Sequence, residues 1–300
     1  MKQAPTRLRA VCGWTAVLIS SAFLGLWAFW GVLENFHEGW YSTSLGENLK
    51  VMVIQYFLPM AIFLVAALLA VRAPRIGAIL HAGLAAFALW FFGMRGAGAL
   101  LIATPLVGLG VLYWVGRIRH RRLAAWLLVG IPVLTTIGFG IAPAWRVFHR
   151  VDDGVKTARV IEGNGVALRW APAGPGWPAD GVPWDVARER CDRLTADGSS
   201  LAEAPQHAWR LPTVDEVVRS LVRGGRHAGG RWDPATATAG YDRSPDKESP
   251  LWEPHSKIIY WWTGTEVDQA RAYRVVYNGM VIPTAKKMGP GYYGYRCVAN

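Results

Sequence analysis

The sequence predicts a two-part protein, an all-α membrane bundle of five transmembrane helices followed by an α+β domain. Five stretches without Asp, Glu, Lys or Arg lie in the first half. The composition changes to mixed charge near residue 150, and short β-rich runs with turn residues then alternate with two helical patterns. We therefore expect a transmembrane domain at 1–145, a linker at 146–159 and an exported domain at 160–300.

The charge-free stretches are residues 10–33, 51–71, 76–94, 96–116 and 123–145. Each is long enough to cross a hydrocarbon layer of roughly 30 Å as a helix. The first stretch is longer than the apolar region of a signal peptide, and four more follow it. We interpret it as a retained helix.

The charge of the chain is unevenly distributed. Residues 1–145 contain 11 Lys and Arg against 3 Asp and Glu, and the remaining residues contain 21 against 18. With 52% hydrophobic and 18% charged residues, a purely soluble enzyme is excluded. Because most of the excess positive charge lies between apolar segments, the expected partner is the lipid bilayer and no nucleic acid is predicted.

The loops predict the orientation. Segments 2–9, 72–75 and 117–122 contain nine Lys and Arg, against Lys50 and Arg95 on the other side. The positive-inside rule then places the N-terminus in the cytoplasm of a bacterial cell and residues 146–300 in the periplasm or outside the cell. Only His81 lies within a span and Cys12 lies at the entry of the first, so the spans are interpreted as an anchor rather than a transporter.

Several elements of the exported half can be placed. Strands are expected at 160–161 and 166–170 around a turn at Asn164-Gly165. A helix beginning at Pro183 would place Cys191 on its buried face. Thr213 and Glu216 form the pattern of a capping box at the start of a second helix.

The remainder of this half is predicted to be a loop-rich stretch at 224–257 followed by an antiparallel sheet. Strands are expected at 258–263, 271–277 and 280–283, with a hairpin at Asn278-Gly279, and a closing strand at 292–298.

Six ordered blocks in this half resemble the Lcl C-terminal-like domain, which belongs with the formylglycine-generating (sulfatase-modifying factor) proteins in the C-type-lectin-like fold. The blocks are GVALRW at 165–170, VPW at 182–184, WRLPT at 209–213, YWWTGTE at 260–266, YNG at 277–279 and YRCV at 295–298. The resemblance assigns structural-motif roles to Trp184, Trp209, Arg210, Pro212, Asn278 and Gly279.

The resemblance also implies a disulfide between Cys191 and Cys297, joining the first helix of the domain to its last strand. An oxidising compartment, which the topology predicts independently, permits this bond. Enzymes of this family hold copper with a pair of active thiols, and pairing of the two cysteines would leave no thiolate. The resemblance therefore implies the fold and not the activity.

Metal and cofactor chemistry has little support in the sequence. Iron-dependent relatives need a histidine cluster, whereas His149, His207, His227 and His255 are scattered. No catalytic residue, metal ligand or cofactor is predicted, although Ca²⁺ or a redox metal stays open.

A concentration of charged residues precedes Trp261, where lectin-like folds usually carry ligand. The candidate ligand-binding residues are Asp242, Arg243, Glu248, Trp252, Glu253, His255 and Trp262. The alternative is a solvated loop of mixed charge. The segment also lacks the Glu-Pro-Asn or Gln-Pro-Asp triplet of calcium-dependent sugar binding.

The sequence thus predicts a membrane-anchored, exported module that binds a protein, peptide or glycan without catalysis. Two other classes remain as alternatives: a divergent metal-dependent oxidase that modifies exported polypeptides, and a membrane-complex subunit. A signalling role would require a membrane-protein partner, because the cytoplasmic loops are too short to hold an output domain.

Overall fold

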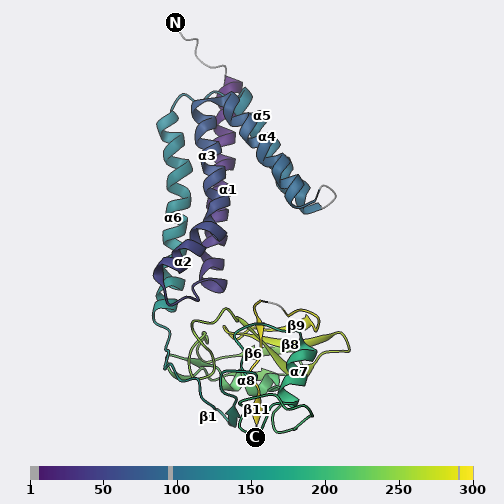
Figure 1. Ribbon diagram of the computed structural model, residues 1–300. Coiled ribbons are helices and arrows are strands. Elements are labelled where there is room, and N and C mark those ends of the chain that lie inside the picture. The colour runs from purple at the N-terminus through teal and green to yellow at the C-terminus, as the bar shows by residue number, and fades with distance from the viewer. Residues whose placement is uncertain (1–6, 94–96, 290, 300) are drawn as a thin grey trace. The chain divides into compact units, whose positions relative to one another are not determined.

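The computed structural model describes residues 7–93, 97–289 and 291–299 (Figure 1). The chain divides into two compact units. The first unit contains the apolar helices as far as Ala144, and the second contains the chain from Trp145 onward together with the segment His37–Leu45. Each unit is described by itself below.

The first unit is entirely helical. Its elements are α1 (Arg7–Glu38), α2 (Leu45–Val51), a π-helical segment (Met52–Phe57), α3 (Leu58–Arg72), α4 (Pro74–Phe91), α5 (Ala97–Val115) and α6 (Arg121–Phe148). The π-helical segment ends two residues before Pro59, which has no backbone N–H to donate to a regular helical ladder.

Four helical stretches within the described residues are long and apolar enough to cross a membrane. They are Arg7–Glu38, Leu45–Arg72, Pro74–Phe91 and Arg121–Phe148. The apolar part of α5, Leu100–Val115, is shorter than the other four. Four of the five expected spans are therefore confirmed. The predicted limits of two spans at residues 94 and 96, and the loop cations Lys2 and Arg95, lie outside the described residues.

The outer surface of these helices is strongly apolar. Trp90, Leu101, Trp126 and Leu134 are 74, 76, 74 and 71% exposed. Side chains of this kind are stable at such exposure in lipid, where the helices satisfy their own backbone groups.

Small residues bring the helices of this unit close together. A Cβ atom at Gly116, after α5, would lie 2.6 Å from the Cα atom of Gly13 in α1. The next residue, Arg117, donates its backbone N–H to the carbonyl oxygen of Arg9 at 2.8 Å. A larger side chain at either glycine would push the two helices apart.

The second unit combines two short helices with four small sheets. Its elements are β1 (Arg159–Gly163), β2 (Val166–Trp170), α7 (Trp184–Asp192), α8 (Val214–Ser220), β3 (Val222–Arg223), β4 (Arg226–His227), β5 (Arg231–Asp233), β6 (Thr238–Gly240), β7 (Tyr260–Glu266), β8 (Arg271–Val276), β9 (Val281–Ala285), β10 (Tyr293–Gly294) and β11 (Val298–Ala299). The larger sheets have the orders β1-β2-β11 and β10-β7-β8-β9. The predicted α+β composition of this half is confirmed, whereas the lectin-like topology stays a prediction.

Both predicted hairpins are confirmed. Asn164 and Gly165 have φ values of 49° and 79°, as a two-residue turn between β1 and β2 requires. Between β8 and β9 the backbone N–H of Gly279 donates to the Val276 carbonyl, and Gly279 has a φ of 90°. This hairpin therefore has a three-residue loop that ends in a left-handed glycine.

Two expectations for the sheets need correction. The predicted closing strand at 292–298 is divided, because Tyr293 pairs with β7 in one sheet and Val298 pairs with β2 in another. The chain changes sheets between them. The stretch at 224–257, predicted to be loop-rich, contains the short hairpin β5–β6 and part of β3–β4.

The two predicted helices form and begin where they were expected. Pro183 caps α7, and Cys191 is on its buried face. The Thr213 side chain accepts from the Glu216 backbone while the Glu216 carboxylate accepts from the Thr213 N–H, which is a complete capping box for α8.

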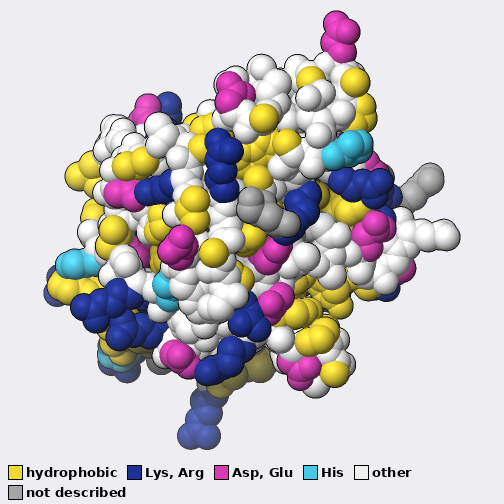
Figure 2. Space-filling view, turned by 90° about the horizontal axis from the view of Figure 1, so that it is seen from below, with side chains coloured by type: hydrophobic (Ala, Val, Ile, Leu, Met, Phe, Trp, Pro, Cys, Tyr) yellow, Lys and Arg dark blue, Asp and Glu magenta, His cyan; other side chains and the backbone are white. Residues whose placement is uncertain are grey.

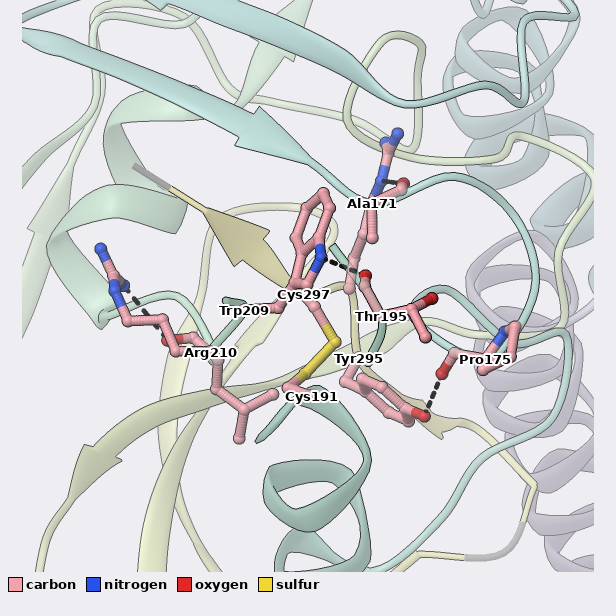
Figure 3. Close-up of a disulfide and its surroundings, with 10 residues drawn as sticks. Ala171, Pro175, Cys191, Thr195, Trp209, Arg210, Tyr295 and Cys297 are labelled. Carbon is pink, nitrogen blue, oxygen red and sulfur yellow. Dashed lines mark hydrogen bonds between the residues drawn. A yellow bond between two sulfur atoms is a disulfide. The ribbon is translucent and has the colours of Figure 1, made fainter. Parts of the chain in front are cut away.

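A disulfide joins Cys191 of α7 to Cys297 in the last residues of the chain (Figure 3). The two Cα atoms are 5.6 Å apart, and both residues are fully buried. Around the bond, the Trp209 indole donates to the Thr195 carbonyl and the Tyr295 hydroxyl donates to the Pro175 carbonyl. The pairing implied by the family resemblance is thus confirmed, and it fixes the end of the chain in the core.

Replacing both paired cysteines should destabilise the second unit. We expect Cys191→Ala/Cys297→Ala to lower the free energy of unfolding by about 2–5 kcal/mol, because the unfolded chain is no longer cross-linked. Urea unfolding of the full chain in detergent measures this change. Cys12→Ala is the matched control, because Cys12 is the free cysteine of the described residues. Equal stability of the double variant and this control would contradict a structural role for the bond.

Candidate functional site

The two tryptophans predicted to line a ligand site are core residues instead. Trp252 is 1% exposed, stacks on Trp261 with ring centroids 3.9 Å apart, and donates its indole N–H to the Ile258 carbonyl. Trp262 is fully buried and donates to the Val182 carbonyl. Because both rings are enclosed and both N–H groups are satisfied, neither lines a surface site.

Asp246 is the centre of a buried ion-pair network. Its Oδ1 accepts from Arg150 at 2.9 Å, and its Oδ2 accepts from Arg223 at 2.9 Å. The side chains of Asp246 and Arg150 are 6 and 5% exposed. Glu248 accepts from Arg223 at 3.0 Å and from the Gly224 backbone N–H at 2.6 Å. Arg150 comes two residues after the end of α6, so this network holds the start of the expected linker.

Further contacts continue along residues 150–159, which we call the juxtamembrane segment. The Ser249 backbone N–H donates to the Val151 carbonyl at 3.0 Å. Lys156 pairs with Glu253 at 2.9 Å, and His255 lies 3.6 Å from a carboxylate oxygen of Asp152. The segment expected to be a linker is thus bound along its length by residues 246–255.

The segment His37–Leu45, which connects α1 to α2, contacts neighbouring parts of the same unit. His37 Nδ1 and the Tyr277 hydroxyl lie 3.0 Å apart, and the Lys257 ammonium lies 5.5 Å from the centroid of the Tyr41 ring. Arg150 also lies over the Tyr277 ring, 5.4 Å from its centroid. Two segments that flank the apolar helices in sequence therefore pack onto the domain.

These contacts revise the predicted ligand loop. Glu248, Glu253 and His255 interact with Arg223, Lys156 and Asp152 of the same chain. Asp242 is exposed and pairs with Arg231, and Arg243 is exposed as well. The structure therefore separates the seven predicted residues into core tryptophans, a glutamate that binds Arg223, two groups that contact the juxtamembrane segment, and exposed charges. It does not bring them together as one surface site.

Burial within this network shifts the pKa of two groups. Lys247 is enclosed completely and donates through Nζ to the Ser256 carbonyl. Burial, reinforced by repulsion from Arg150, lowers the pKa of Lys247 to about 7, although Asp246 and Glu253 act in the opposite direction. Burial raises the pKa of Glu248, partly offset by the Gly224 N–H and Arg223. Lys247 therefore titrates near pH 7.

Sequence reasoning missed the juxtamembrane contacts. Arg150 and Lys156 are cations that follow the last apolar run, and the sequence also shows the concentration of charged residues before Trp261. Arg150 and its partner Asp246 are 96 positions apart in the sequence, so no local sequence pattern indicates that they pair.

The six residues of the resembling motif make structural contacts. Arg210 forms a bidentate ion pair with Glu216, with nitrogen–oxygen distances of 2.6 and 2.8 Å. This hydrogen-bonded pairing raises the pKa of Arg210. The other five residues form hydrogen bonds that each include a backbone group. The indole N–H groups of Trp184 and Trp209 donate to the carbonyls of Thr263 and Thr195. The Pro212 carbonyl accepts from the Gly264 N–H, the Asn278 side chain accepts from the Met280 N–H, and the Gly279 carbonyl accepts from the Tyr241 hydroxyl.

In the part of the chain that the structure describes, no group of three or more His, Cys, Asp or Glu side chains is arranged to hold a metal ion. The histidines considered from the sequence have separate neighbours. His149 stacks on Trp145, His207 contacts Asp192, and His227 contacts the Glu162 carbonyl.

Comparison with known proteins gives one family match. A family model described as a domain of unknown function, DUF7670, matches residues 2–125, which cover most of the apolar helices and less than half of the chain. A search of curated proteins and a search of solved structures each returned no significant match. The N-terminal half is thus similar to a family whose description assigns no activity.

Breaking the network at its centre should loosen the domain. We expect Asp246→Asn to lower the free energy of unfolding by about 3–5 kcal/mol, because Arg150 and Arg223 lose their shared buried counter-ion. The exposed pair of Asp242 and Arg231 provides the control, and Asp242→Asn should cost at most about 0.5 kcal/mol. Urea unfolding of the full chain gives both values. A cost for Asp246→Asn as small as that of the control would count against the network.

Lys247 should make stability depend on pH. Between about pH 7 and its usual pKa of 10.5 the unfolded chain binds this proton and the folded chain does not, so the free energy of unfolding rises with pH. Below pH 7 the folded chain must carry a buried cation, and the cost is greatest. The free energy of unfolding of Lys247→Met minus that of the native chain should therefore be larger at pH 6.5 than at pH 10, by at least about 1 kcal/mol.

The exposed Lys287 supplies the control for this measurement, because Lys287→Met should leave the pH dependence unchanged. Chemical unfolding of the three proteins at several pH values measures the difference. Parallel curves for the native chain and Lys247→Met would refute the expected titration.

Proposed function

We propose that this chain is a membrane-anchored recognition protein of a bacterial inner membrane. Its second unit lies in the periplasm or outside the cell and binds a protein, peptide or glycan ligand without catalysis. Residues 160–300 adopt a formylglycine-generating-enzyme-like form of the C-type-lectin-like fold. The following observations support this proposal.

The charge distribution of the first unit supports an exported second unit. Eight arginines lie at the start of α1, around the α3–α4 turn and around the α5–α6 turn, which meet at one end of this unit (Figure 1). Glu34 lies near the C-terminal end of α1, and Glu47 lies in the first turn of α2, which follows α1. Basic residues are retained in the cytoplasm, so α6 leads to the exported side.

This orientation does not depend on whether α5 crosses the membrane completely. Helices α4 and α5 pack on each other as a hairpin, and a Cβ atom at Gly110 would lie 3.2 Å from the Ala78 carbonyl. A hairpin that crosses twice and one that enters and returns both deliver the chain to the same side. The exported position of the domain follows in either case, with five spans as the proposed number.

The disulfide is the observation that carries the proposal. Both cysteines of the second unit are used in it, and both are fully buried. A stable bond of this kind suits an oxidising compartment, and it leaves the domain no thiolate for copper–thiol chemistry. The helix-to-terminus connection is also the one that the family resemblance implies.

The surface of the domain is compatible with selective binding of a macromolecule. Figure 2 shows Lys and Arg side chains interspersed with Asp and Glu and with hydrophobic groups on the face in view. Mixed polar and apolar surfaces of this kind are typical of non-obligate interfaces.

Site-specific labelling tests the exported position. In a Cys12→Ala background, Glu203→Cys places a thiol on the exposed surface of the second unit, and Arg119→Cys places one in the exposed α5–α6 turn. A membrane-impermeant maleimide should label only Glu203→Cys in sphaeroplasts, and both after lysis. Labelling of Arg119→Cys alone before lysis would reverse the topology and reject an exported recognition module.

A further inference from the structure

Arg274 is held between two tyrosine rings on the four-stranded sheet. It lies on β8 opposite Trp262 of β7, while Tyr260 of β7 pairs with Tyr293 of β10. The Arg274 guanidinium carbon is 3.8 Å from the centroid of the Tyr260 ring and 4.8 Å from that of Tyr293. The side chain thus extends across β7, and the aromatic rings fix the guanidinium by cation–π contacts.

The guanidinium has no hydrogen-bond acceptor in the part of the chain that the structure describes. Among the described residues, Arg274 forms no hydrogen bond and no ion pair, and its Nε and Nη1 atoms are enclosed without a partner. Glu266, the acidic residue of the four strands, pairs with Lys286 and Arg188 instead. The sheet therefore supplies no counter-ion for Arg274.

Other arginines of this domain with enclosed nitrogens each have at least one acceptor, although Arg296 Nη2 and Arg159 Nε are enclosed without one. Arg296 donates from Nε to the Ala171 carbonyl, and from Nη1 to the carbonyls of Pro250 and Leu251. Arg150 donates to Asp246. Arg274 differs from these arginines because none of its nitrogens has an acceptor among the described residues. Leaving two enclosed N–H groups of a cation without acceptors is costly, so Arg274 needs an acceptor from outside the chain.

We propose that Arg274 is an oxyanion-recognition site, which binds a carboxylate or phosphate group of the ligand. Its third nitrogen, Nη2, is not among the enclosed atoms and is therefore accessible. Because Nη2 lies next to both other nitrogens through their shared carbon, an oxyanion that reaches Nη2 can accept a second hydrogen bond from the same planar group. Tyr260 and Tyr293 hold the plane and reduce competition from water.

This inference rests on the proposed recognition function and assigns it one point of contact. It gives Arg274 a binding role, and it predicts a ligand with an accessible negative group. The aromatic walls favour a group attached to a larger molecule, because the rings offer apolar surface beside the anion.

Thermal unfolding of the full chain in a zwitterionic detergent tests the inference. The unfolding midpoint is compared in sodium phosphate, sodium acetate and sodium chloride at equal ionic strength and pH, at about 50 mM oxyanion. We expect at least one oxyanion to raise the midpoint by about 2 °C or more relative to chloride. Comparison of the phosphate and acetate solutions shows whether the site binds a phosphate or a carboxylate group.

Two substitutions on β8 separate specific binding from a general salt effect. Arg274→Met should abolish the oxyanion-dependent rise, and Arg274→Lys, which keeps the charge but not the planar donor set, should reduce it. Arg271→Met is the matched control, because Arg271 is an exposed arginine on the same strand that pairs with Asp268. It should respond as the native chain does.

Two results would overturn the inference: no oxyanion-dependent rise in the native chain, or the same rise in Arg274→Met and Arg274→Lys as in Arg271→Met. The maleimide labelling of Glu203→Cys is independent of both. An exported domain without an anion effect would reject the Arg274 site alone, whereas a cytoplasmic domain would reject the recognition function itself.

Discussion

Asp246 binds two arginines with its two carboxylate oxygens in a region almost closed to water, and the organisation of the second unit depends on these ion pairs. Arg150 enters the network from the juxtamembrane segment, and Arg223 enters it from β3 and also binds Glu248. A charge buried without its partner would be strongly destabilising. The segment that follows α6 is therefore part of the folded domain, which begins at the network and not at the first strand.

Two other features restrict the domain at separate places. The Cys191–Cys297 disulfide fixes the end of the chain against α7, and β11 pairs with β2 near the beginning of the domain. Lys247 is enclosed beside Asp246 at a cost that rises as the pH falls, so a change of pH acts on the loop that holds the juxtamembrane segment. The end of the domain is covalently fixed, whereas its beginning depends on charges.

Elements with a local cause could be predicted from the sequence. The capping box at Thr213 and Glu216, the Asn-Gly hairpins and the apolar spans each depend on a few neighbouring residues. The site could not be predicted in this way. Trp252 and Trp262 have the composition of a ligand platform, yet burial is decided by packing with distant residues such as Trp261 and Val182. The partners of Arg150 and the isolation of Arg274 are likewise tertiary properties, since charge alone does not distinguish a paired arginine from an unpaired one.

Hydrogen exchange of the native full chain tests the central claim most directly. If the network holds the juxtamembrane segment, the backbone amides of Ala173 and Ser249, which donate to carbonyls of that segment, should exchange only through opening of the domain, as those of β2 do. Asp246→Asn should raise their exchange rates while leaving those of β7 and β8 less affected. Fast exchange of these two amides in the native chain, at the rate of an exposed loop, would contradict the account.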